Sequence, residues 1–235
     1  MKVKGKVAIV TGGGGGIGGA LVGELTTHGA RVLVADLDAA RAQAVADKIN
    51  SARPGAAAAV GADVSGTTAV RSLIALAEQD FGPVDMYFAN AGVLGTPGLE
   101  ASDADWDRAI DVNLRAHIRA AQLLIPGWVE RGEGYFVSTA SAAGLLTQIG
   151  GATYAVTKHA AVGFAEWLSI TYGDRGIRVS CLCPMGVNTE LLYGERVPGI
   201  RSVSPLPGRS PPPVRCWSPL RSPATCWPRS TRSTS

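Results

Sequence analysis

The 235-residue chain is predicted to adopt an α/β fold, a doubly wound parallel sheet in a single domain, and three observations predict it. Short apolar runs alternate with longer amphipathic ones. The short runs are nearly continuous in apolar residues, as in strands that are buried on both faces. A glycine cluster separates the first apolar run from the first amphipathic one. This alternation gives parallel strands joined by helices, with ligands expected at the carboxyl ends of the strands.

The predicted elements follow in strict order from the N-terminus to about residue 184. Strands are predicted at 7–11, 31–36, 57–64, 84–90, 135–141 and 177–184, and helices at 17–29, 39–52, 66–81, 102–130 and 150–174. The alanine run at 56–59 is interpreted as the lead-in to the third strand. The length of 235 residues suits one well-buried domain and leaves little room for a second.

Composition excludes several classes of protein. No apolar run approaches the roughly 18–20 residues of a membrane span, and the apolar run at 7–10 is too short for a signal peptide, so we expect a soluble cytoplasmic protein. The four cysteines, with Cys181 and Cys183 two apart, fit neither a disulfide framework nor a metal site, and we expect buried thiols in a strand and no metal.

The net charge of +3 divides unevenly along the chain. Residues 1–190 carry 15 Lys and Arg against 18 Asp and Glu, whereas residues 191–235 carry seven Arg and one acidic residue, Glu195. A nucleic-acid partner requires a basic face on the folded part, so we expect none.

The tail after about residue 192 departs from the α/β pattern. It holds nine of the 14 prolines, eight serines, Trp217 and Trp227, without helical or strand periodicity. We therefore divide the chain into a domain at 1–192 and a Pro/Arg/Ser-rich tail at 193–235. Two interpretations of the tail stay open, a native disordered segment and the product of a reading-frame error.

A glycine-rich loop at residues 11–18, Thr-Gly-Gly-Gly-Gly-Gly-Ile-Gly, follows the first strand and opens the first helix. Glycines there let the backbone approach a pyrophosphate at the helix N-terminus. At the end of the second strand, Asp36 lies 18 residues after Gly18, where an acid accepts hydrogen bonds from the adenosine ribose and repels a 2′-phosphate. Positions 13–15 carry no basic side chain, so NAD is favoured over NADP. Asp36 could instead cap the next helix, a role that Asp38 could fill equally well.

Tyr154 and Lys158 are four residues apart in a predicted helix, and Ser141 precedes Tyr154 by thirteen residues. Side chains four apart lie one turn above the other on the same face, so the two head groups can meet in one pocket. A phenol with its ordinary pKa near ~10 is a poor acid–base catalyst at neutral pH, and a neighbouring ammonium lowers that pKa. Alone, this spacing is more typical of a surface lysine beside a half-buried ring.

Taken together, these motifs resemble those of the short-chain dehydrogenase/reductase family over about residues 3–192. The glycine loop matches the Thr-Gly-x-x-x-Gly-x-Gly loop of its Rossmann-like domain, and Asp63-Val64, Asn90-Ala91-Gly92 and the helix residue Asn113 match further signatures in the right order. The resemblance implies a catalytic tetrad of Asn113, Ser141, Tyr154 and Lys158. It also implies cofactor contacts at Gly12, Gly16, Ile17, Gly18, Asp36, Asp63, Val64, Asn90, Ala91, Gly92, Tyr154, Lys158, Pro184, Val187 and Thr189.

Two positions in this resemblance leave alternatives. Ser138 and Thr139 lie on the same strand end as Ser141, but Ser141 matches the family's Ser-x-Ala-Gly pattern and its separation from Tyr154. Met185 stands where the family usually has glycine, after Pro184, and nothing after Leu192 resembles the family's remaining helices and seventh strand.

The resemblance implies reversible hydride transfer between a secondary alcohol and a ketone, with Tyr154 as acid–base and NAD as cofactor. The alternative is a dinucleotide-binding protein with impaired or no catalysis, because the C-terminal substrate region is missing; a sugar-nucleotide epimerase fits the glycine spacing less well. The apolar segments 93–98 and 145–150 favour a hydrophobic small-molecule substrate. Homo-oligomerisation through the helices at 102–130 and 150–174 is implied by the resemblance alone.

Overall fold

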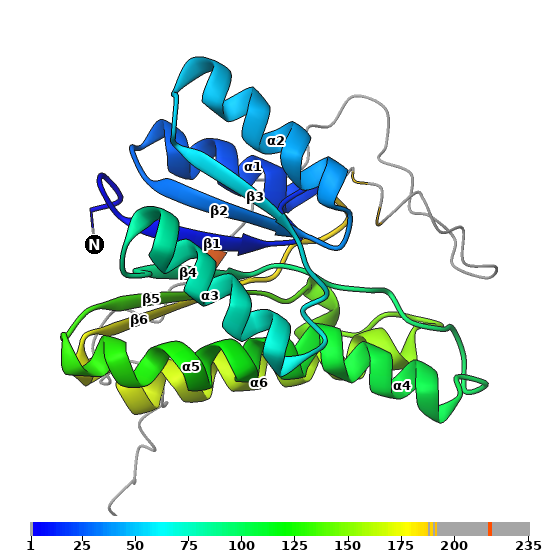
Figure 1. The fold of residues 1–235 in the computed structure, drawn as a ribbon. Helices are drawn as coiled ribbons and strands as arrows, with labels where there is room; N and C mark the ends of the chain where they lie inside the picture. The colour runs from blue at the N-terminus through cyan, green and yellow to red at the C-terminus, as the bar shows by residue number, and fades with distance from the viewer. Residues whose placement is uncertain (1, 188, 190, 192–215, 218–235) are drawn as a thin grey trace, which may run out of the picture.

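The computed structural model describes residues 2–187, 189, 191 and 216–217, and a seven-stranded sheet forms its centre (Figure 1). The strand order is β3-β2-β1-β4-β5-β6-β7, and β1 to β6 are parallel. The strands are β1 Val7–Thr11, β2 Arg31–Asp36, β3 Ala57–Gly61, β4 Met86–Ala89, β5 Gly134–Thr139, β6 Ile177–Leu182 and β7 Cys216–Trp217. The order reverses between β1 and β4, so the predicted doubly wound fold is confirmed.

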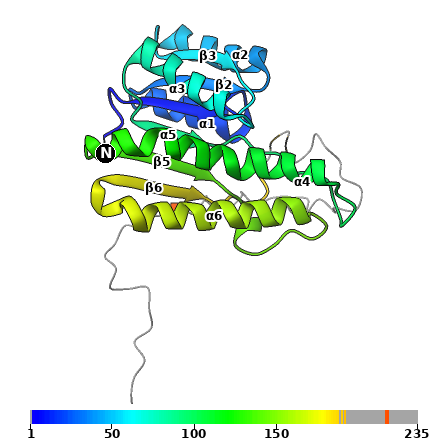
Figure 2. The same cartoon turned by 60° about the horizontal axis from the view of Figure 1, so that its bottom comes forward.

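Helices cover both faces of the sheet (Figures 1 and 2). Helices α1 and α2 contact β1 to β3 on one face, and α3, α5 and α6 pack on the other. The helices are α1 Gly16–Thr27, α2 Ala39–Ala52, α3 Thr67–Phe81, α4 Asp103–Ile110, α5 Ala116–Glu130 and α6 Ala152–Tyr172.

The central strand explains why the apolar runs are continuous. Along β1, Val7 and Ile9 join the core under α3 and α5, whereas Ala8 and Val10 join the core under α1 and α2. Successive strand residues point to opposite faces, so a strand covered on both faces needs apolar side chains at every position.

The tail contributes one short strand that the sequence did not predict. Cys216 and Trp217 pair antiparallel with Leu182 and Cys181 of β6. The outer edge of β6 carries unpaired backbone groups, which pair with any extended segment of suitable geometry. The rest of the predicted tail, 193–215 and 218–235, lies outside the described residues. Among the described residues no helix packs on β5 and β6 on the face that carries α1 and α2.

The predicted helix at 102–130 is interrupted. Ser102 caps α4 in a capping box with Asp105, and the chain then passes through a π-helical turn at Asp111–Arg115 before α5 continues. A π-turn inserts one extra residue per turn and is common at functional sites. Here it turns Asn113 inward, where its side chain is fully buried.

Four predicted strands end earlier in the structure than in the sequence. The differences are 57–64 against Ala57–Gly61, 84–90 against Met86–Ala89, 135–141 against Gly134–Thr139 and 177–184 against Ile177–Leu182. The residues beyond each strand end leave the sheet at its carboxyl edge. Those residues include Asp63, Asn90, Ser141 and Pro184, so the loops that follow the strands carry the predicted site.

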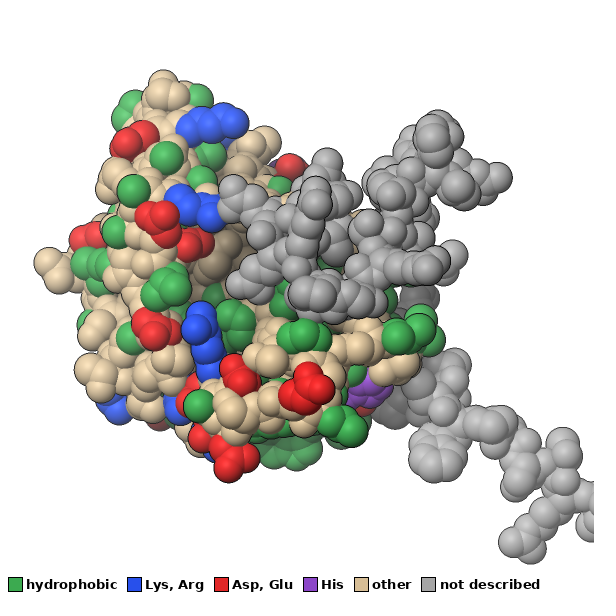
Figure 3. All heavy atoms as spheres, turned by 90° about the vertical axis from the view of Figure 1, so that its right-hand side faces the viewer, with side chains coloured by type: hydrophobic (Ala, Val, Ile, Leu, Met, Phe, Trp, Pro, Cys, Tyr) green, Lys and Arg blue, Asp and Glu red, His purple; other side chains and the backbone are tan. Residues whose placement is uncertain are grey.

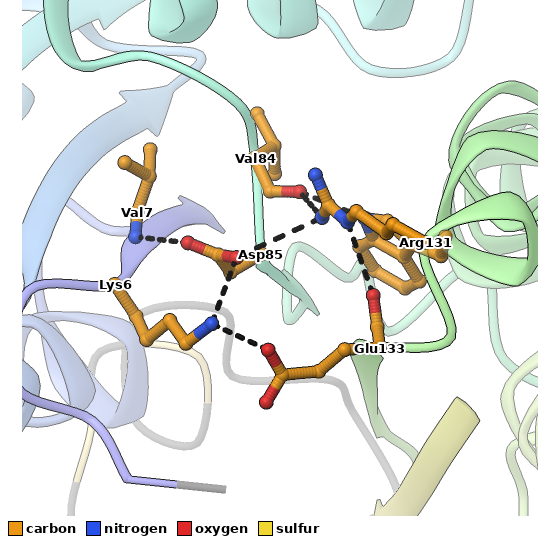
Figure 4. Close-up of polar contacts among 7 residues, drawn as sticks. Lys6, Val7, Val84, Asp85, Arg131 and Glu133 are labelled. Carbon is orange, nitrogen blue, oxygen red and sulfur yellow. Dashed lines mark hydrogen bonds and ion pairs between the residues drawn. The ribbon is translucent and has the colours of Figure 1, made fainter. Parts of the chain in front are cut away.

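At the opposite, amino-terminal edge of the sheet, ion pairs and hydrogen bonds join the strands (Figure 4). Asp85 accepts a hydrogen bond from the Val7 amide at 2.9 Å and lies 3.3 Å from Lys6 Nζ. Lys6 also contacts Glu133 at 2.6 Å, and Arg131 reaches both Asp85 and the Val84 carbonyl. This network joins the starts of β1, β4 and β5 on the side remote from the predicted site.

Candidate active site

The glycine loop between β1 and α1 is packed so closely that side chains do not fit. Gly12 and Gly16 have φ of 62° and 54°, which favours glycine. A Cβ at Gly18 would lie 2.0 Å from the Gly12 carbonyl oxygen. The loop therefore presents bare backbone at the N-terminus of α1, the arrangement that binds a pyrophosphate. Ile17 is half-buried in the first turn of α1.

Thr11 and Asn90 lock this loop onto the end of β4. Thr11 Oγ1 accepts hydrogen bonds from the amides of Asn90 and Ala91, at 3.0 and 3.2 Å, and donates to the Phe88 carbonyl. Asn90 Nδ2 donates to the carbonyls of Thr11 and Gly12 at 3.0 and 3.2 Å. The Asn90-Ala91-Gly92 segment thus holds the start of the glycine loop against the end of β4.

Asp36 lies at the mouth of the loop. Its Oδ2 accepts from the Gly14 amide at 2.9 Å, while Asp38 caps α2 by accepting from the amides of Ala40 and Arg41. The helix-cap alternative for Asp36 is therefore filled by Asp38. A side chain at Gly15 would come within 2.8 Å of Arg41 Nη2, so α2 brings a guanidinium to a loop that has no basic residue of its own.

The other predicted cofactor residues surround the same edge. Asp63 follows β3 and accepts from the Ser65 amide at 2.9 Å, and Val64 beside it is buried. Pro184 follows β6, and its carbonyl accepts from the Ala142 amide. Thr189 approaches the glycine loop, since its Cγ2 would lie 3.1 Å from a Cβ at Gly16, and Val187 is half-buried in the loop between them.

Tyr154 and Lys158 lie in α6, both buried, with Lys158 Nζ 5.6 Å from the centre of the Tyr154 ring. Lys158 Nζ donates to the Thr139 carbonyl at 2.9 Å, and burial lowers its pKa to about 8. Burial raises the pKa of Tyr154, and a hydrogen bond with Ser141 opposes that rise. The sequence predicted a lowered tyrosine pKa; in this structure desolvation outweighs every favourable contact of the phenolate.

Ser141 follows β5 and is the hydroxyl that reaches Tyr154. Of the two competing residues, Ser138 is fully buried with its hydroxyl 3.0 Å from His117 Nδ1, and Thr139 is buried with a hydroxyl that has no partner among the described residues. The structure thus brings Ser141, rather than Ser138 or Thr139, together with Tyr154.

Asn113 reaches the same centre from the π-turn. Its side-chain amide pairs with both backbone groups of Val93, at 2.9 Å each, and Nδ2 also donates to Thr157 Oγ1 at 3.0 Å. A side chain at Gly92 would meet Asn113 Oδ1 and Lys158 Nζ, each at 3.2 Å. All four predicted tetrad residues, Asn113, Ser141, Tyr154 and Lys158, therefore converge beside Gly92 and the end of β5.

The model of the short chain dehydrogenase family matches residues 6–196. The chain belongs to this family. It is therefore an oxidoreductase of the class that acts on CH–OH groups with a nicotinamide dinucleotide. The 3beta-hydroxysteroid dehydrogenase 2 of Eggerthella lenta is 34% identical over 210 residues, 85% of this chain and 78% of that protein. The cyclohexanol dehydrogenase of an Acinetobacter species is 35% identical over 81% of this chain and 76% of that protein.

Solved structures of this short-chain dehydrogenase family share the fold. A 3-ketoacyl-(acyl-carrier-protein) reductase from Brucella melitensis, complexed with NADH, superimposes with a TM-score of 0.77 at 32% identity, covering 81% of this chain and 80% of that one. A family member from Burkholderia phymatum in complex with NAD gives 0.79 at 32% identity, covering 84% and 71%. No helix in the described part of this dehydrogenase is long and apolar enough to cross a membrane.

Three contributors to the site were not predicted from the sequence. Thr157 accepts from Asn113, the Thr139 carbonyl accepts from Lys158, and Arg41 lies beside Gly15. Thr157 carried a detectable signal, because a polar residue between Tyr154 and Lys158 on the buried face of α6 needs a partner. Arg41 carried none, because its approach depends on how α2 packs.

Proposed function

We propose that the protein is an NAD-dependent dehydrogenase that interconverts a hydrophobic secondary alcohol and its ketone. The convergence of Ser141, Tyr154 and Lys158 at the carboxyl edge of the sheet, next to a loop of bare glycine backbone, carries this proposal. The residues fit the cofactor because the close packing at Gly12 and Gly18 admits no Cβ, which leaves bare backbone at the N-terminus of α1 for a pyrophosphate. When bound, the nicotinamide supplies the hydride acceptor and donor.

Each tetrad residue has a proposed role. Tyr154 as phenolate accepts the hydroxyl proton of the alcohol, and Ser141, already hydrogen-bonded to Tyr154, holds the substrate oxygen. Lys158 stabilises the phenolate and binds the nicotinamide ribose. Asn113 positions α6 and the water that passes the proton to solvent. Burial raises the pKa of Tyr154 and so disfavours its phenolate. Positive charge brought to the site lowers that pKa and favours the phenolate.

NAD is proposed over NADP because Asp36 places a carboxylate 2.9 Å from the Gly14 amide, where a 2′-phosphate would meet negative charge. Arg41 beside Gly15 acts in the opposite sense, since its guanidinium attracts phosphate. Fluorescence titration with NADH and NADPH checks the balance. We expect tighter NADH binding, and a gain in NADPH affinity in Asp36→Asn that Arg41→Gln abolishes. Equal affinity for both cofactors in the unchanged protein would contradict the NAD assignment.

The hydrophobic substrate is proposed from the side chains exposed around the site. Hydrophobic side chains are exposed on the face of the molecule that Figure 3 shows. The exposed hydrophobic residues of the segments after β5 and β6 are Leu145, Leu146, Ile149, Met185 and Leu191. Relatives include a cyclohexanol dehydrogenase and a D-threitol dehydrogenase, whose names give an apolar alcohol and a polar one, respectively. We expect turnover of cyclohexanol to exceed that of threitol.

A homo-oligomer is proposed through the outer surfaces of α5 and α6, which lie side by side in Figures 1 and 2. A groove there is lined by Ile125 and Val129 of α5 and by Phe164 and Trp167 of α6, and Trp167 is 53% exposed. Exposed aromatic and aliphatic patches of this kind mark interfaces. Sedimentation velocity of Trp167→Glu should show that the oligomer dissociates.

A cytoplasmic location is proposed because Cys181 and Cys183 are free thiols, as in reducing compartments.

Oxidation of cyclohexanol with NAD, followed by NADH absorbance, tests the function. We expect Tyr154→Phe to abolish turnover and to bind NADH as the unchanged protein does, because the ring remains and only the proton acceptor is lost. Tyr172→Phe, on the same helix but beside Trp167, is the matched control and should retain turnover. Turnover by Tyr154→Phe would refute the assignment. NADH binding without turnover of any alcohol by the unchanged protein would favour the non-catalytic alternative.

A further inference from the structure

Two thiols meet at the carboxyl end of β6, directly behind the site. Cys181 is buried in the strand as predicted, but Cys183 lies just past the strand end and is half-buried. The residues are two apart, so their side chains point to the same face of the sheet, and their Sγ atoms are 3.8 Å apart. No role in the proposed dehydrogenase reaction uses either sulfur.

The surroundings of Cys183 favour its thiolate. A hydrogen bond joins the two sulfurs, and the Cys181 thiol is its donor when Cys183 is the thiolate. This bond, a hydrogen bond from the Ser141 amide and the nearby positive charge of Lys158 together lower the pKa of Cys183 against the opposing effect of burial. The hydrogen bond with Cys183 and burial raise the pKa of Cys181. One sulfur of the pair is thus a partly exposed nucleophile and the other a protonated neighbour. This is the arrangement of an attacking and a resolving cysteine.

We propose that Cys181 and Cys183 form a peroxide-sensitive dithiol that closes to a disulfide beside the active site. The Cys183 thiolate attacks hydrogen peroxide, giving the sulfenic acid and hydroxide. The Cys181 thiol then displaces the sulfenic oxygen, forming the S–S bond and releasing water. Each sulfur loses one electron, and the two electrons reduce one peroxide to the level of water and hydroxide.

The spacing makes this disulfide reversible. Two residues of extended chain span roughly 6.6 Å between Cα atoms, near the upper limit of about 6.8 Å for a disulfide. Closure brings the two Sγ atoms from 3.8 Å to about 2.05 Å and favours a Cα separation of about 5.5–6 Å, so the extended backbone after β6 shortens, and the strained disulfide is readily reduced by cellular thiols. Cys183 lies one residue beyond the last strand residue, Leu182.

Movement of this segment reaches the catalytic serine. The Ala140 amide donates to the Leu182 carbonyl and the Ala142 amide donates to the Pro184 carbonyl, both at 2.8 Å. These two bonds lie on either side of Cys183 in the segment after β6 and on either side of Ser141 in the segment after β5. Closure of the disulfide shifts the backbone that holds Ser141, and this effect on turnover rests on the proposed function, whereas formation of the disulfide does not.

The experiment uses the full chain with Cys216→Ser and Cys226→Ser, so that only Cys181 and Cys183 remain. The protein is treated with hydrogen peroxide, blocked with iodoacetamide and digested with trypsin. Cleavage after Arg178 and Arg196 leaves both cysteines in one peptide, 179–196. We expect this peptide to lose the mass of two hydrogens and to resist alkylation, and dithiothreitol to restore both thiols. Cys183→Ser and Cys181→Ala in the same background should form no such peptide.

Turnover supplies the second readout. We expect peroxide to reduce it roughly 10- to 100-fold, because displacements near 1 Å in an active site cost that much, and dithiothreitol to restore it. Cys183→Ser should keep its turnover in peroxide. The proposal is overturned if peptide 179–196 keeps both thiols, or if Cys183 is oxidised to sulfinic acid while Cys181 stays free. The mass readout is independent of activity, so an inactive chain leaves this test of the dithiol intact.

Discussion

Asn113 Nδ2 donates a hydrogen bond to Thr157 Oγ1 over 3.0 Å, and this bond joins the π-turn before α5 to the helix that carries Tyr154 and Lys158. Thr157 Oγ1 in turn donates to the carbonyl of Thr153 at 2.8 Å. Both side chains are fully buried, so neither has water as a substitute partner. The bond therefore fixes the position of α6 relative to the end of β4.

Thr157→Val tests this link, because valine keeps the shape of threonine and removes its oxygen. We expect a loss of about 1–2 kcal/mol of unfolding free energy in urea. We also expect a lower kcat with unchanged NADH affinity, since the glycine loop does not depend on Thr157. Thr157→Ser restores the hydroxyl and should recover most of kcat. Equal kcat in the valine and serine variants would show that the hydrogen bond does not position the catalytic residues.

Gly18 and Gly23 form a matched pair on α1. A methyl group at Gly18 would lie 2.0 Å from the Gly12 carbonyl oxygen, whereas a methyl group at Gly23 meets nothing within 4 Å. We expect Gly18→Ala to lose NADH binding, measured by fluorescence titration. Gly23→Ala should bind NADH normally and gain roughly 0.5–1 kcal/mol of stability, because alanine favours a helix. Normal NADH binding by Gly18→Ala would contradict the close packing of the loop.

His117 is fully buried, and its Nε2 has no hydrogen-bond partner in the part of the chain that the structure describes. Burial, with the charge of Lys158 as a second cause, lowers its pKa to about 3. Below pH 6.5 the unfolded chain binds a proton at this histidine and the folded protein does not, so stability falls with falling pH until about pH 3. From pH 7 to pH 5 this amounts to about 2 kcal/mol.

The pH dependence is checked by urea unfolding at pH 7 and pH 5. Compared with His117→Gln, which can still hydrogen-bond Ser138, the unchanged protein should lose about 2 kcal/mol more between the two values. His28→Gln, at an exposed histidine, serves as the control and should keep the unchanged protein's loss to within about 0.5 kcal/mol. An identical loss in His117→Gln and the unchanged protein would mean that the folded state accepts the proton at His117.

The sequence predicts those features that are local. The glycine loop, the alternation of strands and helices and the Tyr154–Lys158 face each follow from neighbours along the chain, and the structure confirms the fold they imply. The π-turn at Asp111–Arg115 was not predicted, because 102–130 has the composition of one continuous helix. Arg41 beside Gly15 and the pairing of β7 with β6 depend on contacts between distant segments, which no periodicity records.

Asp85, drawn with its partners in Figure 4, lies at the amino-terminal edge of the sheet, remote from the glycine loop. Its carboxylate accepts from the Val7 amide and pairs with Lys6 at 3.3 Å, and its side chain is only 17% exposed. We expect Asp85→Ala to cost about 2–4 kcal/mol of unfolding free energy, because a buried amide and a partly buried ammonium lose their partner. Asp80→Ala, at an exposed residue of α3, should change stability by less than about 0.5 kcal/mol. NADH affinity should be unchanged in both, since neither side chain reaches the carboxyl edge. A parallel loss of NADH affinity and stability in Asp85→Ala would show that the two edges of the sheet are coupled.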